Sequence, residues 1–220
     1  MDTMSGESVP SLAPGITWMV DESDRSTAPH QLVLAQLEIE RGRVFWIDAR
    51  DLASTYALYA IATTPRTLDP IRIARAWTAH QHHTLVQRTV DRASHRTRLL
   101  VVPHVCSLYR DDDLDTHEAD RLLTSSLRTL SALAEALAVP VLVTAPAQER
   151  PHLEPIVDHE LECEPTQYGY AFTGESFRTT VFQNHGWWQT TIPYWVELLG
   201  AEPSDVDIVH EVSTGLETFA

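Results

Sequence analysis

The sequence contains no lysine, so all sixteen of its basic residues are arginines. Thirty-one Asp and Glu residues stand against them, which gives a formal net charge of −15. Such a balance argues against nucleic-acid binding through bulk charge and leaves binding through a local surface open. No apolar run approaches the roughly 18 residues that a membrane helix needs. We therefore expect no membrane association.

The missing lysines have two interpretations. A heavily acidic chain without lysine resembles proteins of salt-accumulating archaea, in which a dense carboxylate shell keeps the surface hydrated and dispersed. Compositional drift in a GC-rich genome also favours arginine codons and would give the same absence. The sequence favours a halophilic archaeal origin.

Cysteine is scarce as well. Cys106 and Cys163 are too few for a disulfide framework or a four-thiolate zinc site, and we expect two buried thiols. The first thirteen residues have neither a basic segment nor an apolar segment of a secretory signal, so we expect a cytoplasmic protein.

From residue 15 to residue 144, short apolar segments alternate with helical ones. The predicted strands are Gly15–Val20, Arg43–Asp48, Ile71–Ala76, Arg98–Val102 and Val139–Thr144, and the predicted helices are His30–Glu40, Leu52–Ala62, Ala79–Ala93 and Leu114–Ala138. In the last helix, leucines and alanines recur at steps of four and three and form one apolar stripe. This alternation predicts a mainly parallel central sheet covered by helices on both faces, an α/β/α fold.

The pattern changes after Pro155. Segments Glu160–Cys163, Tyr168–Thr173 and Phe177–Gln183 are predicted to be short strands that extend the sheet in antiparallel fashion. Trp187–Leu199 is aromatic and then helical in pattern. We divide the chain into a flexible segment 1–13, one α/β domain over 14–200 and a mobile acidic tail 201–220, with one weak strand at Val206–Val209.

Three ordered segments resemble the RecA/RadA recombinase family. They are VFWIDARDLAS from Val44, IRIARAWTAHQHHTLVQRTV from Ile71 and LLVVPHVCSLYRDDDL from Leu99. The resemblance extends more weakly over Pro14 to Thr144. It implies a RecA-like, P-loop-type fold, whose members bind and hydrolyse ATP.

The chain departs from that family at the positions that handle ATP. A Walker A loop needs glycines to expose backbone N–H groups, a lysine for the phosphates and a hydroxyl for Mg²⁺. The matching loop has no glycine or lysine, carries three carboxylates and is followed by Pro29. Its residues are Asp21, Glu22, Ser23, Asp24, Arg25, Ser26 and Thr27.

Two further catalytic positions are changed. By the resemblance, Pro103 stands where the Walker B aspartate would bind Mg²⁺ through water, and Arg50 stands where a glutamate would activate the attacking water. Phosphoryl transfer depends on positioning and charge neutralisation, and this chain has lost the residues for both. We therefore predict a pseudo-ATPase with no catalytic residues, no cofactor and a vestigial phosphate loop.

The leading functional hypothesis is an accessory or regulatory protein of DNA recombination or repair. Its partner would be an active RadA-type recombinase or a second copy of itself. One alternative is a sensor that binds a nucleotide or another small anion, with Arg25 and Arg50 near the old cleft. Another is a metal-dependent enzyme that uses His80, His82 and His83, although these also suit a polar helix start.

Two other clusters allow more than one interpretation. Trp187, Trp188, Tyr194 and Trp195 form either a partner-binding surface or the closing core of the sheet. Six acids between Arg110 and Asp120 suit the start of a long helix better than a Mg²⁺ or Ca²⁺ site, because they lack the alternating ligand pattern of such a site.

Overall fold

The central strands form where the sequence has its short apolar runs. The structure is a computed structural model that describes residues 9–21, 26–51, 53–166, 169–174, 177–184 and 187–190, with side chains as far as residue 174. Five predicted strands and four predicted helices are confirmed, with ends that differ by up to three residues. No helix in these ranges is long and apolar enough to span a membrane.

The elements follow one another in an alternating order. The strands are β1 (Gly15–Val20), β2 (Arg43–Ala49), β3 (Ile71–Ala76), β4 (Thr97–Val102), β5 (Pro140–Ala145), β6 (His159–Thr166), β7 (Gly169–Gly174), β8 (Phe177–Asn184) and β9 (Trp187–Thr190). The helices are α1 (Ala28–Ile39), α2 (Thr55–Ile61), α3 (Ala79–Arg92), α4 (Thr116–Leu137) and α5 (Arg150–Leu153). Three short 3-10 helices are η1 (Pro65–Leu68), η2 (Ser107–Arg110) and η3 (Ala147–Glu149).

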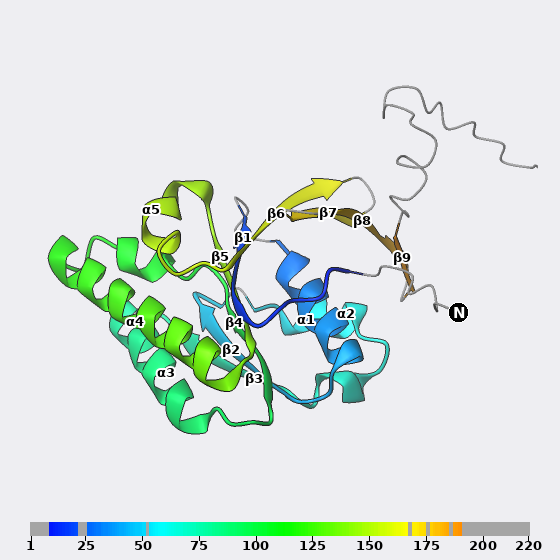
Figure 1. Ribbon diagram of the computed structural model, residues 1–220, viewed down its shortest axis with the longest axis horizontal. Coiled ribbons are helices and arrows are strands. Elements are labelled where there is room, and N and C mark those ends of the chain that lie inside the picture. The colour runs from blue at the N-terminus through cyan, green and yellow to red at the C-terminus, as the bar shows by residue number, and fades with distance from the viewer. Residues whose placement is uncertain are drawn as a thin grey trace, which may run out of the picture.

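All described strands join one sheet in the order β3-β2-β4-β5-β1-β6-β7-β8-β9. The six strands from β3 to β6 run parallel, and β7, β8 and β9 continue the sheet in antiparallel pairs. Figure 1 shows these last strands extending away from the helical layers. The predicted fold class, a mainly parallel α/β sheet with an antiparallel extension, is confirmed. The antiparallel part begins one strand later than predicted, because Glu160–Cys163 lies on β6, which pairs parallel with β1.

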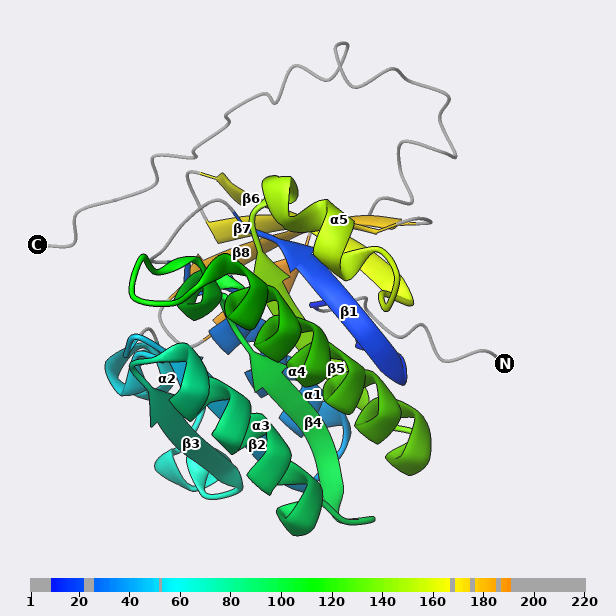
Figure 2. The ribbon, with the colours of Figure 1, turned by 90° about the vertical axis from the view of Figure 1, so that its left-hand side faces the viewer.

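Helices cover both faces of the parallel part, and each face has its own core. Ile16 and Trp18 of β1 belong to the core that packs under α3 and α4, while Met19 belongs to the core under α1 and α2. The same alternation sends Trp46 of β2 to the second core. Figures 1 and 2 show α3 and α4 together on one face and α1 with α2 on the other.

Local signals explain where the long helices begin. The Asp115 carboxylate accepts hydrogen bonds from the N–H groups of His117 (3.0 Å) and Glu118 (3.4 Å) and so caps α4. Thr78 caps α3 by accepting from the N–H of Gln81 at 3.2 Å. The acidic run before α4 therefore includes a helix cap, as the sequence predicts.

Other local predictions were wrong or lie outside the described residues. Short helices η3 and α5 follow β5, where no helix was expected. Cys106 is buried as predicted, but Cys163 is only half-buried because it lies on β6 near the end of the core. The expected helix before Leu199 and the weak strand Val206–Val209 lie outside the described residues.

Candidate functional site

Four of the parallel strands, β1, β2, β4 and β5, end at the same edge of the sheet. In open α/β sheets this carboxyl edge is where ligands bind. The predicted phosphate loop follows β1, Arg50 follows β2 and Pro103 follows β4. The topology therefore brings the sequence-predicted positions to one edge, with residues 22–25 of the loop outside the described residues.

The start of α1 is occupied by groups of the protein itself. The hydroxyl of Tyr170, from β7, accepts a hydrogen bond from the Thr27 N–H at 2.9 Å and lies 3.3 Å from the Thr27 hydroxyl. The next N–H, of Ala28, donates to the Ser26 hydroxyl at 3.2 Å. Pro29 has no N–H to offer. A helix start that would otherwise receive an anion is therefore largely satisfied from within.

An acidic side chain lies at the end of β1. Asp21 is 6% exposed, and its N–H donates to the Ala145 carbonyl of β5 at 3.2 Å. A carboxylate in this position opposes a phosphate by like charge. The first residue of the predicted loop is therefore unsuited to a nucleotide.

Arg50 lies in a charged cluster after β2. Its backbone is left-handed, with a φ of 63°, and its guanidinium forms an ion pair with Asp111. Next to it, Arg75 contacts the buried Asp48 carboxylate at 3.2 Å and Asp51 at 2.6 Å. Both arginines thus already face carboxylates, and an incoming anion would have to displace them.

The turn after β4 is fixed to β5. Pro103 is buried and provides no side-chain oxygen. His104 adopts a left-handed backbone, with a φ of 49°, and its N–H donates to the Thr144 hydroxyl at 2.9 Å. The N–H of Val105 donates to the Thr144 carbonyl at 3.0 Å. This turn offers no side chain that could hold Mg²⁺ at the end of β4.

A buried thiol lies beside this turn. Cys106 is 2% exposed, and burial together with the nearby Glu149 carboxylate raises the pKa of its thiol well above the ordinary value. Arg110 donates two hydrogen bonds to Glu149, at 3.0 and 2.7 Å, and lowers the pKa of that carboxyl. A thiol that stays protonated is a poor nucleophile, so this geometry does not favour a catalytic role for Cys106.

The three histidines of α3 have separate partners. His82 is buried and its Nδ1 lies 2.8 Å from the Tyr109 hydroxyl, which in turn lies 2.8 Å from the Ser126 hydroxyl. His83 contacts the same serine at 3.0 Å, whereas the exposed His80 lies 3.7 Å from Glu118. No three His, Cys, Asp or Glu side chains gather to hold a metal ion anywhere in the described ranges. The geometry does not favour the metal-enzyme alternative.

Only part of the aromatic C-terminal cluster lies within the described residues. Trp187 and Trp188 lie on β9, where their backbones pair with Asn184 and Gln183 of β8. Their side chains are outside the described set, and so are Tyr194 and Trp195 altogether. Whether these aromatic residues form a binding surface or a core stays a prediction.

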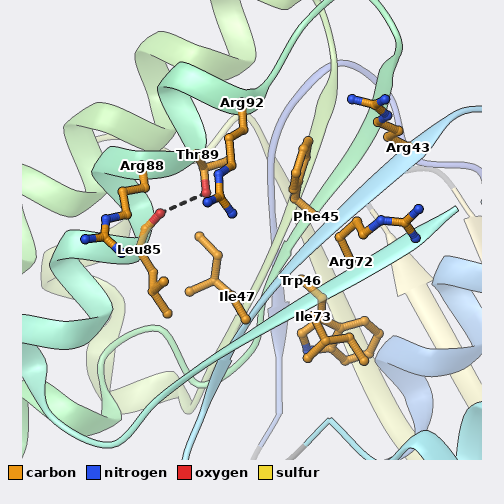
Figure 3. A pocket seen from close by; sticks show the side chains of 11 residues that line it. Arg43, Phe45, Trp46, Ile47, Arg72, Ile73, Leu85, Arg88, Thr89 and Arg92 are labelled. Atoms are coloured by element: carbon orange, nitrogen blue, oxygen red, sulfur yellow. Dashed lines mark hydrogen bonds between the residues drawn. The ribbon is translucent and has the colours of Figure 1, made fainter.

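Sequence reasoning missed a second candidate site, a cleft beside β3. It has a volume of about 550 Å³ and lies between α3 and the strands β2 and β3. Figure 3 shows apolar side chains between the helix and the strands and arginines around them. The apolar part consists mainly of Phe45, Ile47 and Leu85, and the arginines are Arg43, Arg72, Arg88 and Arg92. The spacing of Arg88 and Arg92, four residues apart on one helix, was the available signal.

The strand order, the covered parallel sheet and the loop–helix unit after β1 define a RecA-like α/β protein. A comparison with models of protein families matches Rad51 over residues 23–158, which is more than half of the chain. The chain belongs to the Rad51 family. A comparison with curated proteins gave no match.

Proposed function

We propose that this Rad51-family chain does not hydrolyse ATP and acts as an accessory protein that binds a protein partner. The observation that carries the proposal is the occupied start of α1. There the Tyr170 hydroxyl accepts a hydrogen bond from the Thr27 N–H, and Pro29 has no N–H to donate. Backbone N–H groups at this helix start are the main phosphate ligands of a P-loop.

The other changed positions support the same conclusion. The chain has no lysine for the β- and γ-phosphates. At the predicted metal position, Pro103 has no oxygen ligand, and the predicted base position holds Arg50 in an ion pair with Asp111. Losing the phosphate donors, the metal ligand and the base together leaves phosphoryl transfer without its usual electrostatic stabilisation.

The open edge of the sheet supports partner binding. Strand β3 is the terminal strand of the sheet and pairs only with β2 among the described strands. The N–H and C=O groups on its outer side can pair with an extended segment of another protein, whose side chains would enter the cleft under α3. We propose an active recombinase of the same family as the partner, with self-association as the alternative, and a role in DNA recombination or repair. Two cysteines without disulfide partners suit the proposed cytoplasmic location.

The proposal is tested first with Mg-ATP. We expect no phosphate release above the buffer blank, and flat heats in isothermal titration with ATP and ADP. A purified active Rad51-family recombinase under the same conditions is the positive control. Phosphate release would contradict the proposal. Measurable heats without turnover would instead support the alternative of a nucleotide or anion sensor.

The second test is direct binding between the purified chain and an active Rad51-family recombinase. We expect R88E/R92E, at the rim of the cleft, to weaken the complex because the reversed charges line the site of strand addition. The matched control is R121E/R128E, which makes the same charge change on the exposed surface of α4. Sedimentation of the chain alone would reveal self-association. Equal loss in both variants, or no association in either experiment, would reject the cleft as the docking site.

A further inference from the structure

Most arginines that form no ion pair among the described side chains line two adjoining hollows. Fourteen arginines have described side chains, and six of these form ion pairs, namely Arg50, Arg75, Arg98, Arg110, Arg121 and Arg150. Of the eight others, six line two adjoining hollows, namely Arg41, Arg43, Arg72, Arg88, Arg92 and Arg96. Because acids outnumber arginines in this chain, this group of guanidinium groups without ion pairs stands out from the rest of the described surface.

The second hollow is a groove at the amino edge of the sheet, opposite the edge that follows β1. It has a volume of about 340 Å³ and is lined by Arg41, Gly42, Arg43, Pro70, Arg96 and Arg98. We call it the arginine groove. Arg43 lines both this groove and the cleft beside β3, so the basic surface is continuous between them.

Backbone contacts hold the two arginine-bearing segments together. The N–H of Arg43 donates to the Arg96 carbonyl at 2.8 Å. A Cβ at Gly42 would lie 2.2 Å from Cγ of Arg98 and 2.9 Å from the Arg96 carbonyl oxygen, so glycine permits the close approach. Arg98 is itself fixed, since it donates to the carbonyl of His95 at 2.8 Å and contacts Glu40 at 2.7 Å.

The construction of the arginine groove indicates the chemistry of its ligand. Strands β2 and β4 at this place are internal strands paired on both sides, so a peptide cannot add a strand there. Apart from Pro70, the lining offers no apolar side chain to anchor a peptide. The guanidinium groups of the lining supply charge and hydrogen bonds, and these match phosphate oxygens.

We propose that the arginine groove binds the phosphate backbone of a nucleic acid strand. An extended row of arginines, continuing from Arg43 into Arg72 on β3, suits a polymer of phosphates better than one small anion. The overall charge of −15 weakens long-range attraction, so binding depends on close contacts. Each phosphate contact lowers the slope of log K against log salt by about 0.7 for a single strand.

The test is fluorescence anisotropy with a labelled single-stranded oligonucleotide of roughly 16 nucleotides, the upper range of common site sizes. It is performed at several salt concentrations at which far-UV circular dichroism shows the folded protein. We expect binding that weakens with salt, and a loss of at least about tenfold, equivalent to about 1.4 kcal/mol, in R41E/R96E. R121E/R128E changes the net charge equally and is expected to stay within about twofold of the wild type, because it leaves every groove contact intact.

Four outcomes would overturn the proposal. They are no binding by the folded wild type, an equal loss in both variants, equally tight binding of inorganic pyrophosphate, and displacement of the oligonucleotide by a synthetic peptide of residues 201–220. The last two would assign the groove to a small anion or to an acidic protein segment. R41E/R96E leaves the cleft rim at Arg88 and Arg92 unchanged, so recombinase binding tests the proposed function separately.

Discussion

Tyr170 links two parts of the chain that are distant in sequence. Its hydroxyl accepts a hydrogen bond from the Thr27 N–H at the start of α1, at a sequence separation of 143 residues. In the proposed function, this contact occupies a backbone donor that a phosphate would otherwise use. A residue of the antiparallel extension thereby contacts the start of the first helix of the parallel part.

We expect Tyr170→Phe to lower the free energy of unfolding by about 1 kcal/mol, because the Thr27 N–H loses its acceptor in a half-buried position. The same variant is expected to remain without ATP turnover, since Pro29 and Asp21 are unchanged. Denaturant unfolding measures the first effect and phosphate release the second. Tyr59→Phe, at an exposed position of α2, is the matched control.

The burial of His82 leads to a prediction of how the free energy of unfolding depends on pH. Burial, with a smaller effect of His83, lowers the pKa of His82 to about 4, whereas the unfolded value is about 6.5. The unfolded chain therefore binds a proton between these values that the folded chain does not bind. The contribution of neutral His82 to the free energy of unfolding is therefore fully present above pH 6.5. It is lost as the pH falls toward 4.

We expect His82→Gln to lose less stability than the wild type between pH 7 and pH 4, by up to about 3 kcal/mol. Urea unfolding at several pH values gives the difference directly. His80→Gln, at an exposed position of the same helix, is the control for the replacement of a histidine outside the core. Parallel pH curves for the wild type and His82→Gln would show that His82 is not buried in its neutral form.

At the scale of elements, the connection between α1 and β2 is the tightest point of the arginine groove. We expect Gly42→Ala to lower the free energy of unfolding by about 1–3 kcal/mol, because the added methyl group meets the Arg96 carbonyl and Arg98. The double variant Gly42→Ala/Arg98→Ala removes the flexible partner and is expected to recover part of the loss. An additive result from denaturant unfolding would contradict this contact.

Element type was predictable because it depends on local pattern. The run RLLVV marks β4 and the leucine stripe marks α4, and both were found from sequence alone. The site was less predictable. The positions of Arg50 and Pro103 followed from the resemblance, but the contact of Tyr170 with Thr27 and the meeting of Arg43 with Arg96 depend on strand order, which no local pattern encodes.

At the scale of the whole molecule, the acidic surface is expected to make stability depend on salt. A net charge of −15 repels itself, and raising salt from about 0.1 M to about 1 M shortens the screening length from about 10 Å to about 3 Å. We expect Tm to rise with salt, by roughly 2–4 °C for each 1 kcal/mol that screening adds to the free energy of unfolding. Calorimetry in NaCl and in KCl separates screening from ion-specific effects, which would differ between the two salts. A Tm that falls with salt would contradict the predicted halophilic adaptation.

The sheet that separates the two cores also separates two buried tryptophans, whose fluorescence can report on each side. Trp18 is fully buried on one side and Trp46 on the other. Because the chain has six tryptophans, variants that keep only Trp18 or only Trp46, with phenylalanine at the other tryptophan positions, would each report on one side of the molecule. Comparing the two emission changes during unfolding would reveal whether both layers melt together or whether one helical layer detaches first.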